Sequence, residues 1–319
     1  MLPDGRRIGA HLPLGGGMLK AADRAHEIGA TAIQIFGDNP TAWRRRTDPP
    51  TEQAAFRERL AAHGIGPIAI HAAYLINLAG PDESFFEKSV DVLARELRTA
   101  PGFGARYVNV HTGSHRDAGL ETGIERLADG VVRVLDQVES GPDAATLVLE
   151  NSAGGGFGLG VTVEELADIA DAIARRGVPA DRVAFCLDTA HLWAAGYRLS
   201  DPDEVDVIVD AFDRGLGIDR LVMVHLNDSK SEVGSRLDRH QHVGAGGIGE
   251  AGMRALLSHP RLAHVAYLLE TPGMDEGYDA INLARAAAIA AGEPVELLPP
   301  EALNMRGSRA RSAPPAERD

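Results

Sequence analysis

The sequence predicts a (β/α)8 barrel, the TIM-barrel fold, in which eight parallel strands close into one sheet that helices surround. Two observations predict this fold. Short apolar runs rich in Val, Ile and Leu alternate with longer stretches of helical spacing, a pattern typical of a parallel sheet covered by helices. These runs number eight over about 290 residues, which is the count and length of a single barrel domain.

Each predicted strand is a short apolar segment, and in chain order the strands span residues 8–10, 32–36, 67–70, 107–110, 146–149, 183–187, 221–224 and 265–269. Helix signals lie between them. A helix predicted over residues 52–62 stops before Gly64, because glycine readily adopts the left-handed conformation that ends a helix. Thr162 with Glu165 three residues later forms a capping box, and Asp201 precedes a proline in a first helical turn.

The composition changes near the end of the chain. Residues 1–293 form the predicted barrel domain, whereas residues 294–319 are rich in Pro, Arg, Ser and Ala. Prolines break helices, and a segment with few apolar residues cannot bury enough surface to fold. We therefore expect a disordered C-terminal tail over residues 294–319.

Six consecutive predicted strands are followed directly by a side chain that can bind metal: His71, His111, Glu150, Asp188, His225 and Glu270. The C-terminal ends of barrel strands form one rim around one cavity, so we expect these side chains to converge although about 200 positions separate them in sequence. Three carboxylates and three imidazoles in a partly dry cavity would repel one another or stay unsatisfied. Bound divalent cations remove that difficulty.

Three further candidates lie in loops of the same rim. His191 follows Asp188 by three residues. One residue separates Asp238 from His240, so both point to the same side of an extended loop. Zinc takes four ligands in most sites, and catalytic sites leave one place for water. Nine side chains with a shared carboxylate therefore suit two or three zinc ions.

Composition and charge limit the compartment and the partners. The 319 residues are 44% hydrophobic, which suffices for a large core, and carry a formal net charge of -14, which disfavours anionic membranes and a broad nucleic-acid surface. The single cysteine, Cys186, excludes an intramolecular disulfide. No apolar stretch approaches the roughly 18 residues of a membrane helix, and the N-terminus has no signal-peptide core. We expect a soluble cytoplasmic protein.

The rim motifs resemble those of endonuclease IV, the apurinic/apyrimidinic endonuclease family also called deoxyribonuclease IV. The resemblance extends from about residue 8 to residue 290 and fills all nine metal positions of the family in order. It rests on the segments HAAYLINL at 71–78, HTGSH at 111–115, LENSAG at 149–154, CLDTAH at 186–191, HLNDSK at 225–230, DRH at 238–240 and LET at 269–271.

The resemblance implies three zinc ions, with Mn²⁺ as an alternative in one site. It assigns the ligands in three sets: His71, His111 and Glu150; Glu150, Asp188, His225 and Glu270; and His191, Asp238 and His240. Glu150 is then the bridge. Glu150 and Glu270 are the expected catalytic residues, which hold and orient a bridging hydroxide, and Glu270 is the expected proton acceptor.

The implied activity is that of a hydrolase in base excision repair. The enzyme would cleave the phosphodiester bond 5′ to an abasic site in double-stranded DNA, leaving a 3′-hydroxyl and a 5′-deoxyribose phosphate. Trimming of blocked 3′ ends is the implied second activity. A monomer is the default expectation for the oligomeric state. Three divalent cations would bring the net charge of -14 to about -8, so the rim can be positive on an acidic chain.

For DNA contact the resemblance points to loops on the same rim. Tyr74 and Leu75 are the wedge candidates, because aromatic and apolar side chains can replace the stacking that an abasic site lacks. The loop after the second strand supplies the remaining candidates, Asn39, Trp43, Arg44, Arg45 and Arg46, where phosphates would pass. Thr41 departs from the family, which often has a larger residue such as arginine there, and threonine cannot reach as far into the base stack.

Two other functions remain open. A barrel sugar isomerase or epimerase of the xylose isomerase-like group shares the fold and also binds divalent ions at the rim. Such an enzyme would need neither the third ligand set, His191 with Asp238 and His240, nor the Tyr74–Leu75 wedge. A catalytically silent binder of damaged DNA is disfavoured, because no expected metal ligand is missing from the sequence.

Overall fold

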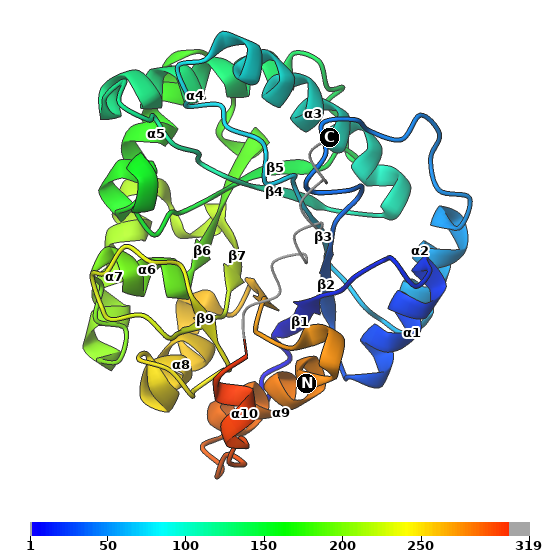
Figure 1. The fold of residues 1–319 in the computed structure, drawn as a ribbon, viewed down its shortest axis with the longest axis vertical. Helices are drawn as coiled ribbons and strands as arrows, with labels where there is room; N and C mark the ends of the chain where they lie inside the picture. The colour runs from blue at the N-terminus through cyan, green and yellow to red at the C-terminus, as the bar shows by residue number, and fades with distance from the viewer. Residues whose placement is uncertain (1, 306–319) are drawn as a thin grey trace, which may run out of the picture.

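The computed structural model describes residues 2–305 and confirms the predicted barrel (Figure 1). All eight barrel strands are parallel, and β1 pairs with both β2 and β10, which closes the sheet. The strands are β1 (Arg7–His11), β2 (Ala32–Ile35), β3 (Ile68–His71), β4 (Tyr107–His111), β5 (Thr146–Glu150), β6 (Val183–Asp188), β7 (Leu221–His225) and β10 (Ala266–Leu269).

Helices cover the outside of the barrel, and one long helix follows most of the strands (Figure 1). The long helices are α1 (Met18–Glu27), α2 (Gln53–Ala62), α3 (Glu83–Phe103), α4 (Leu120–Leu135), α5 (Val163–Arg175), α7 (Pro202–Leu216), α8 (Gly249–Ser258) and α9 (Tyr278–Ala291), and α6 (Thr189–Ala195) and α10 (Pro300–Leu303) are short. Within residues 2–305 no helix has the length and apolar character that a membrane crossing requires.

The helix boundaries follow the local signals. The Thr162 hydroxyl accepts a hydrogen bond from the backbone N–H of Glu165 at 3.2 Å, which caps α5 as the capping box predicts. Asp201 caps α7, and Pro202 occupies its first position. Helix α2 ends at Ala62, and Gly64 has φ +67°, a conformation that favours glycine. All three predicted helix signals are therefore confirmed.

Two layers of apolar side chains form the core. The larger layer packs strands against helices. The smaller one fills the barrel interior with Ala32, Ala69, Val148, Ala184, Cys186, Met223, Ala266 and Leu268. Cys186 is fully buried, and burial raises the pKa of its thiol to about 12. Cys186 therefore serves as a small apolar residue of the barrel interior.

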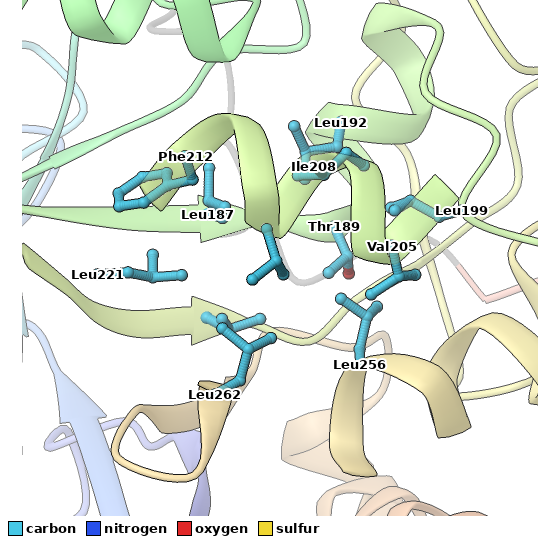
Figure 2. A pocket seen from close by; sticks show the side chains of 12 residues that line it. Leu187, Thr189, Leu192, Leu199, Val205, Ile208, Phe212, Leu221, Leu256 and Leu262 are labelled. Atoms are coloured by element: carbon cyan, nitrogen blue, oxygen red, sulfur yellow. The ribbon is translucent and has the colours of Figure 1, made fainter. Parts of the chain in front are cut away.

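A small cavity remains between the barrel and its helix layer, next to β6 and β7 and under α7 and α8 (Figure 2). The cavity has a volume of about 20 Å³, and Thr189 is the only polar residue that lines it. The Thr189 hydroxyl turns to the backbone carbonyl of Asn227 at 2.6 Å. The cavity is therefore an apolar packing defect that lies apart from the rim side chains.

The first part of the predicted tail is ordered. Helix α10 lies within residues 294–305, and Ala302 is fully buried. Gln241 donates a hydrogen bond to the carbonyl of Leu303 at 3.2 Å, and His242 Nε2 lies 3.1 Å from the carbonyl of Ala302. The prediction of disorder is thus wrong for residues 294–305, because backbone carbonyls there find partners on the body of the protein. Residues 306–319 lie outside the described residues.

Candidate metal centre

The barrel brings all nine predicted ligand side chains to one rim. His71, His111, Glu150, Asp188 and His225 are the last residues of consecutive strands, and Glu270 directly follows β10. Strand register places His111 beside Glu150 and Asp188 beside His225. The remaining three lie in the adjoining loops. His191 is in the first turn of α6, whose N-cap is Asp188, and His240 begins β9 (His240–Gln241), which pairs with β8 (Asp228–Ser229).

Glu150 occupies the centre of this array. Its Oε2 lies 3.7 Å from Nε2 of both His71 and His111, and its Oε1 lies 3.3 Å from Nδ1 of His225. The Glu150 side chain is buried, and its Oε1 also lies 3.4 Å from Nδ1 of His191. This central position fits the bridging role that the resemblance implies for Glu150.

Among the described residues, four groups of side chains have potential ligand atoms that lie within 4.8 Å of one another. Three of them are His71, His111 and Glu150; Asp188, His225 and Glu270; and Asp188, His191 and His240. The fourth combines Glu150 and His225 with Cys186, whose raised pKa keeps the thiol protonated and disfavours it as a ligand. Asp238 adjoins the third group, with carboxylate oxygens 3.5 Å from His191 Nε2 and 3.0 Å from His240 Nε2. These groups overlap the three expected ligand sets without matching them fully: the second group lacks Glu150, and the third contains Asp188 in place of Asp238.

Four histidines have one ring nitrogen held by an oxygen acceptor, which orients the ring. Nδ1 lies 2.8 Å from the Ala72 carbonyl in His71, 2.9 Å from the Asn151 carbonyl in His191 and 2.9 Å from the Glu270 carbonyl in His240. In His225, Nε2 lies 3.0 Å from Oε1 of Gln34. Because a carbonyl only accepts, the held nitrogen carries a proton, and the other nitrogen faces the rim carboxylates, where it can bind a cation once the ring is neutral. Metal-binding histidines are fixed in this way.

Three buried polar atoms of the array make no well-aligned hydrogen bond, although each lies 3.0–3.3 Å from an oppositely charged member of the array. They are Glu150 Oε1, His225 Nδ1 and His240 Nε2. A buried polar atom without a partner is unfavourable, and such atoms are rare in folded proteins. Each of these atoms is the one that its side chain directs toward the other candidate ligands. Cations at this position would satisfy all three, so the donor set fits bound metal.

The pKa values of the array show strong coupling between imidazoles and carboxylates. Burial lowers the pKa of His240, but Asp188 and Asp238 outweigh it and raise the value to about 9. Burial likewise opposes the shift in His225, where the carboxylates of Glu270 and Glu150 hold the pKa well above its ordinary value. Without a cation, protons on the imidazoles therefore neutralise the carboxylates. Divalent ions can replace those protons.

Buried amide side chains, which the sequence reading missed, hold the array in place. Asn227 donates to Asp188 Oδ2 at 2.7 Å and accepts from the backbone N–H of Glu270 at 2.8 Å. Asn109 donates to Glu150 Oε2. A signal for Asn109 was present, since it is a polar residue inside an otherwise apolar strand. Gln34 gives the same signal within β2.

Gln34 connects three members of the rim. Its Nε2 donates to Glu270 Oε1 at 2.6 Å and lies 3.0 Å from His11 Nδ1. Since a carboxylate only accepts, the amide nitrogen must face Glu270, and the amide oxygen then faces His225. This orientation places the proton of His225 on Nε2 and leaves its Nδ1 directed at Glu150. Gln34 thus determines which nitrogen of His225 is available to a metal.

The predicted wedge and its neighbouring loop lie on the same rim. Tyr74 is 46% exposed and Leu75 is half-buried. The Tyr74 backbone N–H donates to the carbonyl of Pro40 at 3.0 Å, so the loop after β3 contacts the loop after β2. Asn39 is exposed, and its Oδ1 accepts hydrogen bonds from the backbone N–H and the hydroxyl of Thr41.

The three consecutive arginines point in different directions. Arg44 and Arg46 are exposed, as phosphate contacts would be. The Arg45 side chain is only 5% exposed and lies 3.2 Å from the carboxylate of Glu96 on α3. Trp43 is half-buried with its ring against Phe85 at 5.8 Å. Burial and pairing with Glu96 therefore disfavour a phosphate contact by Arg45.

A second feature that the sequence reading missed is an exposed, strained stretch of the rim. Within residues 2–305 the non-glycine residues with positive φ are Arg116, Phe157 and Arg236. The loops that carry them touch, since the N–H of His115 donates to the Phe157 carbonyl at 3.0 Å and a Cβ on Gly155 would lie 2.8 Å from the Arg236 carbonyl. Phe157 is 54% exposed. Backbone strain of this kind is concentrated at functional sites.

Comparison with known proteins agrees with the fold and the rim motifs. Residues 22–292 match the family described as xylose isomerase-like TIM barrel. A protein of Natronomonas pharaonis named "Probable endonuclease 4" is 42% identical over 266 residues, which cover 83% of this chain and 92% of the relative. A protein of the same name from Methanoculleus marisnigri is 39% identical over 89% of this chain and 98% of the relative.

Solved structures give the same result. The crystal structure of endonuclease IV from Thermus thermophilus superposes with a TM-score of 0.77 and 38% identity, covering 90% of this chain and 99% of that one. A D-tagatose 3-epimerase-like protein superposes with a TM-score of 0.65 at 16% identity, which shows a shared fold alone. The resemblance read from the rim motifs is confirmed, and the chain belongs to the endonuclease IV family of xylose isomerase-like TIM barrels.

Proposed function

We propose that this protein is a zinc-dependent apurinic/apyrimidinic endonuclease of base excision repair. It hydrolyses the phosphodiester bond 5′ to an abasic site in duplex DNA, leaves a 3′-hydroxyl and a 5′-deoxyribose phosphate, and trims blocked 3′ ends. The observation that carries the proposal is the rim array. In a chain of the endonuclease IV family, nine imidazole and carboxylate groups converge, and buried ligand atoms among them make no well-aligned hydrogen bond in the protein.

The proposed metal ligands fit zinc, which accepts nitrogen and oxygen donors. One ion would be held by His71, His111 and Glu150; a second by Glu150, Asp188, His225 and Glu270; and a third by His191, Asp238 and His240, with Mn²⁺ an alternative in one site. When bound, divalent cations polarise the phosphodiester and make water a nucleophile near neutral pH.

The chain's own residues have separate tasks. Glu150 is buried, accepts from Asn109 and holds its position between two ligand sets. The Glu270 side chain is 17% exposed, against 1% for Glu150, so it faces the space that substrate would enter. Burial raises the pKa of Glu270, but His225 and His11 outweigh it and hold the value below its ordinary range. Glu270 is therefore ionised at neutral pH, and its position beside the substrate space makes it the proposed proton acceptor.

Recognition of the abasic site falls to the exposed rim loops. Tyr74 and Leu75 would enter the minor groove, because extruding a nucleotide that lacks its base requires less unstacking than extruding an intact one. Arg44 and Arg46 would contact phosphates, and Asn39 and Trp43 belong to the same loop. Thr41 is too short to fill the base stack beside them. Exposed Phe157, on the other side of the rim, is available for that contact.

The test combines metal counting with incubation on a duplex that carries one abasic site. We expect two or three zinc ions per monomeric chain, a single nick on the 5′ side of the lesion, loss of nicking on chelation and recovery when zinc is restored. At matched zinc content, Glu270→Gln should lose cleavage, because the amide keeps an oxygen for the metal but cannot accept the proton. Fewer than two ions together with no nicking would refute the nuclease assignment. Isomerisation of a sugar by the zinc-loaded protein would favour the epimerase alternative instead.

A further inference from the structure

A buried carboxylate lies beneath the two loops that carry most of the proposed DNA contacts. Glu96 is near the middle of α3, a helix whose other buried residues are almost all apolar. Its carboxylate lies 3.2 Å from the Arg45 guanidinium, and the two side chains are 8% and 5% exposed. Burying two charges costs solvation free energy, so an ion pair that is buried to this extent stabilises a structure only where its geometry is favourable.

Arg45 also fixes the shape of its own loop. Its second guanidinium nitrogen donates to the carbonyl of Asn39 at 2.6 Å, which closes the loop on itself. The backbone N–H of Arg46 donates to Asp38 at 2.7 Å, and Arg95, next to Glu96 on α3, donates to the carbonyl of Arg46. Two consecutive residues of α3 therefore hold the loop of residues 38–46 against the barrel.

The second loop reaches the same carboxylate. The backbone of Ala73 is close enough to lower the pKa of Glu96, and the next residue, Tyr74, donates its backbone N–H to the carbonyl of Pro40 at 3.0 Å. Glu96 thus lies where the loop of residues 38–46 and the loop of residues 72–75 meet. Removing one partner of a buried pair leaves the other charge unpaired, so each loop depends on both side chains.

We propose that Glu96 and Arg45 are positioning residues that hold these two loops in the arrangement that binds DNA, without touching the DNA themselves. The proposal rests on the proposed function for its substrate. It differs from a direct phosphate contact by Arg45 in one respect that can be measured. A phosphate contact releases counterions and steepens the salt dependence of binding, whereas a buried tether does not.

The experiment compares Arg45→Met and Glu96→Gln with Arg44→Met as the control for an exposed arginine. Burial raises the pKa of Glu96 to about 7, with Arg45 acting in the opposite direction, so the assays are run at pH 8, where the carboxylate is ionised. Measurements are zinc content, kcat and KM on an abasic duplex, the dissociation constant across a salt series, and amide hydrogen exchange of both loops.

We expect Arg45→Met and Glu96→Gln to behave alike. Each should raise KM and Kd by about tenfold or more, which corresponds to roughly 1.4 kcal/mol, with unchanged zinc content, kcat within a few-fold and an unchanged salt slope. Exchange should speed up at Tyr74 and across residues 38–46. The double variant should be no worse than either single one, because the two residues act as a unit. Arg44→Met should instead lower the salt slope by about one.

Two results would overturn the proposal. If Arg45→Met lowered the salt slope by about one while Glu96→Gln bound DNA normally, Arg45 would be a phosphate contact. If both variants bound and cleaved like the unaltered protein, the pair would have no role in positioning the loops. Should a single variant fold poorly, the apolar pair Arg45→Leu with Glu96→Leu removes both charges and gives the same comparison. Failure of the unaltered protein to nick abasic DNA would refute the proposed function instead.

Discussion

Replacing Gln34 by methionine tests the reasoning that connects the amide network to metal binding. Methionine keeps the volume and the flexible stem of glutamine but donates and accepts no strong hydrogen bond. The change leaves Glu270 Oε1, His11 Nδ1 and the Nε2–H of His225 without their shared partner, in a position that is fully buried.

The magnitude follows from these three lost contacts. Each buried group left without a partner is unfavourable by about 1–3 kcal/mol, so we expect the ion-free protein to lose about 3 kcal/mol or more in its free energy of unfolding. Loss of a partner that orients a metal-binding histidine weakens metal affinity by about 10–100-fold. For the ion that His225 and Glu270 would hold, this is roughly 1.4–2.7 kcal/mol.

The assay is competition for zinc with a chelator of known affinity, together with nitrogen NMR of histidine-labelled protein. In the unaltered protein the His225 ring should carry its proton on Nε2, and in Gln34→Met that preference should weaken. Tyr267→Phe is the matched control, because it removes a buried hydroxyl that donates to the Leu256 carbonyl at 2.8 Å while Leu256 lies on α8, outside the candidate ligand sets. If Gln34→Met bound zinc with unchanged affinity, the argument from ring orientation would be refuted.

Three further predictions concern pH, packing and reactivity. Without a cation, Asp188 and Asp238 outweigh burial and raise the pKa of His240 to about 9, and the same carboxylates hold the pKa of His191 well above its ordinary value, so zinc must displace protons from this ligand set at pH 7. The zinc affinity of the set should therefore rise by about tenfold or more per pH unit between pH 7 and pH 9, and a flat profile in chelator competition would contradict this. Val205→Ile adds one methylene beside the apolar cavity and should raise the free energy of unfolding by about 0.8 kcal/mol. The melting temperature should then rise by about 1–2 °C. A lower melting temperature would show that the side chain overpacks the cavity. Cys186 should resist alkylation at pH 8 in the folded protein and react on unfolding, because burial raises the pKa of its thiol to about 12. Fast labelling of the folded protein would refute the burial of this thiol.

Much of the site could be predicted because, in a barrel, the position of a residue along its strand determines where that residue lies in the fold. A residue at the C-terminal end of a strand must lie on the rim, so His71 and His225 could be brought together without knowledge of any distance. The His240 position was harder, since it depends on a short hairpin in a loop, and there the Asp-x-His spacing supplied the signal.

Side-chain direction in a loop could not be predicted in the same way. Arg45 and Arg46 are neighbours of the same type, yet one turns inward because a carboxylate about fifty residues later in the chain lies beneath it. Composition misled in a similar manner at residues 294–305, where Pro and Ala content indicated disorder. Their order comes from Gln241 and His242, whose side chains contact the backbone carbonyls of Leu303 and Ala302. No local sequence pattern identifies these two partners.

Closure of the barrel by β10 has a consequence for how the protein is made. The last strand to be synthesised pairs with the first, and Glu270, directly after it, belongs to one ligand set and holds His240 of another through its carbonyl. A nascent chain that has been synthesised only as far as β7 contains most of the candidate ligands but lacks the closed barrel that holds them in place. We expect metal to load onto the finished barrel rather than to guide its folding, so a shortage of zinc in the cell should yield folded, empty protein that can still be activated.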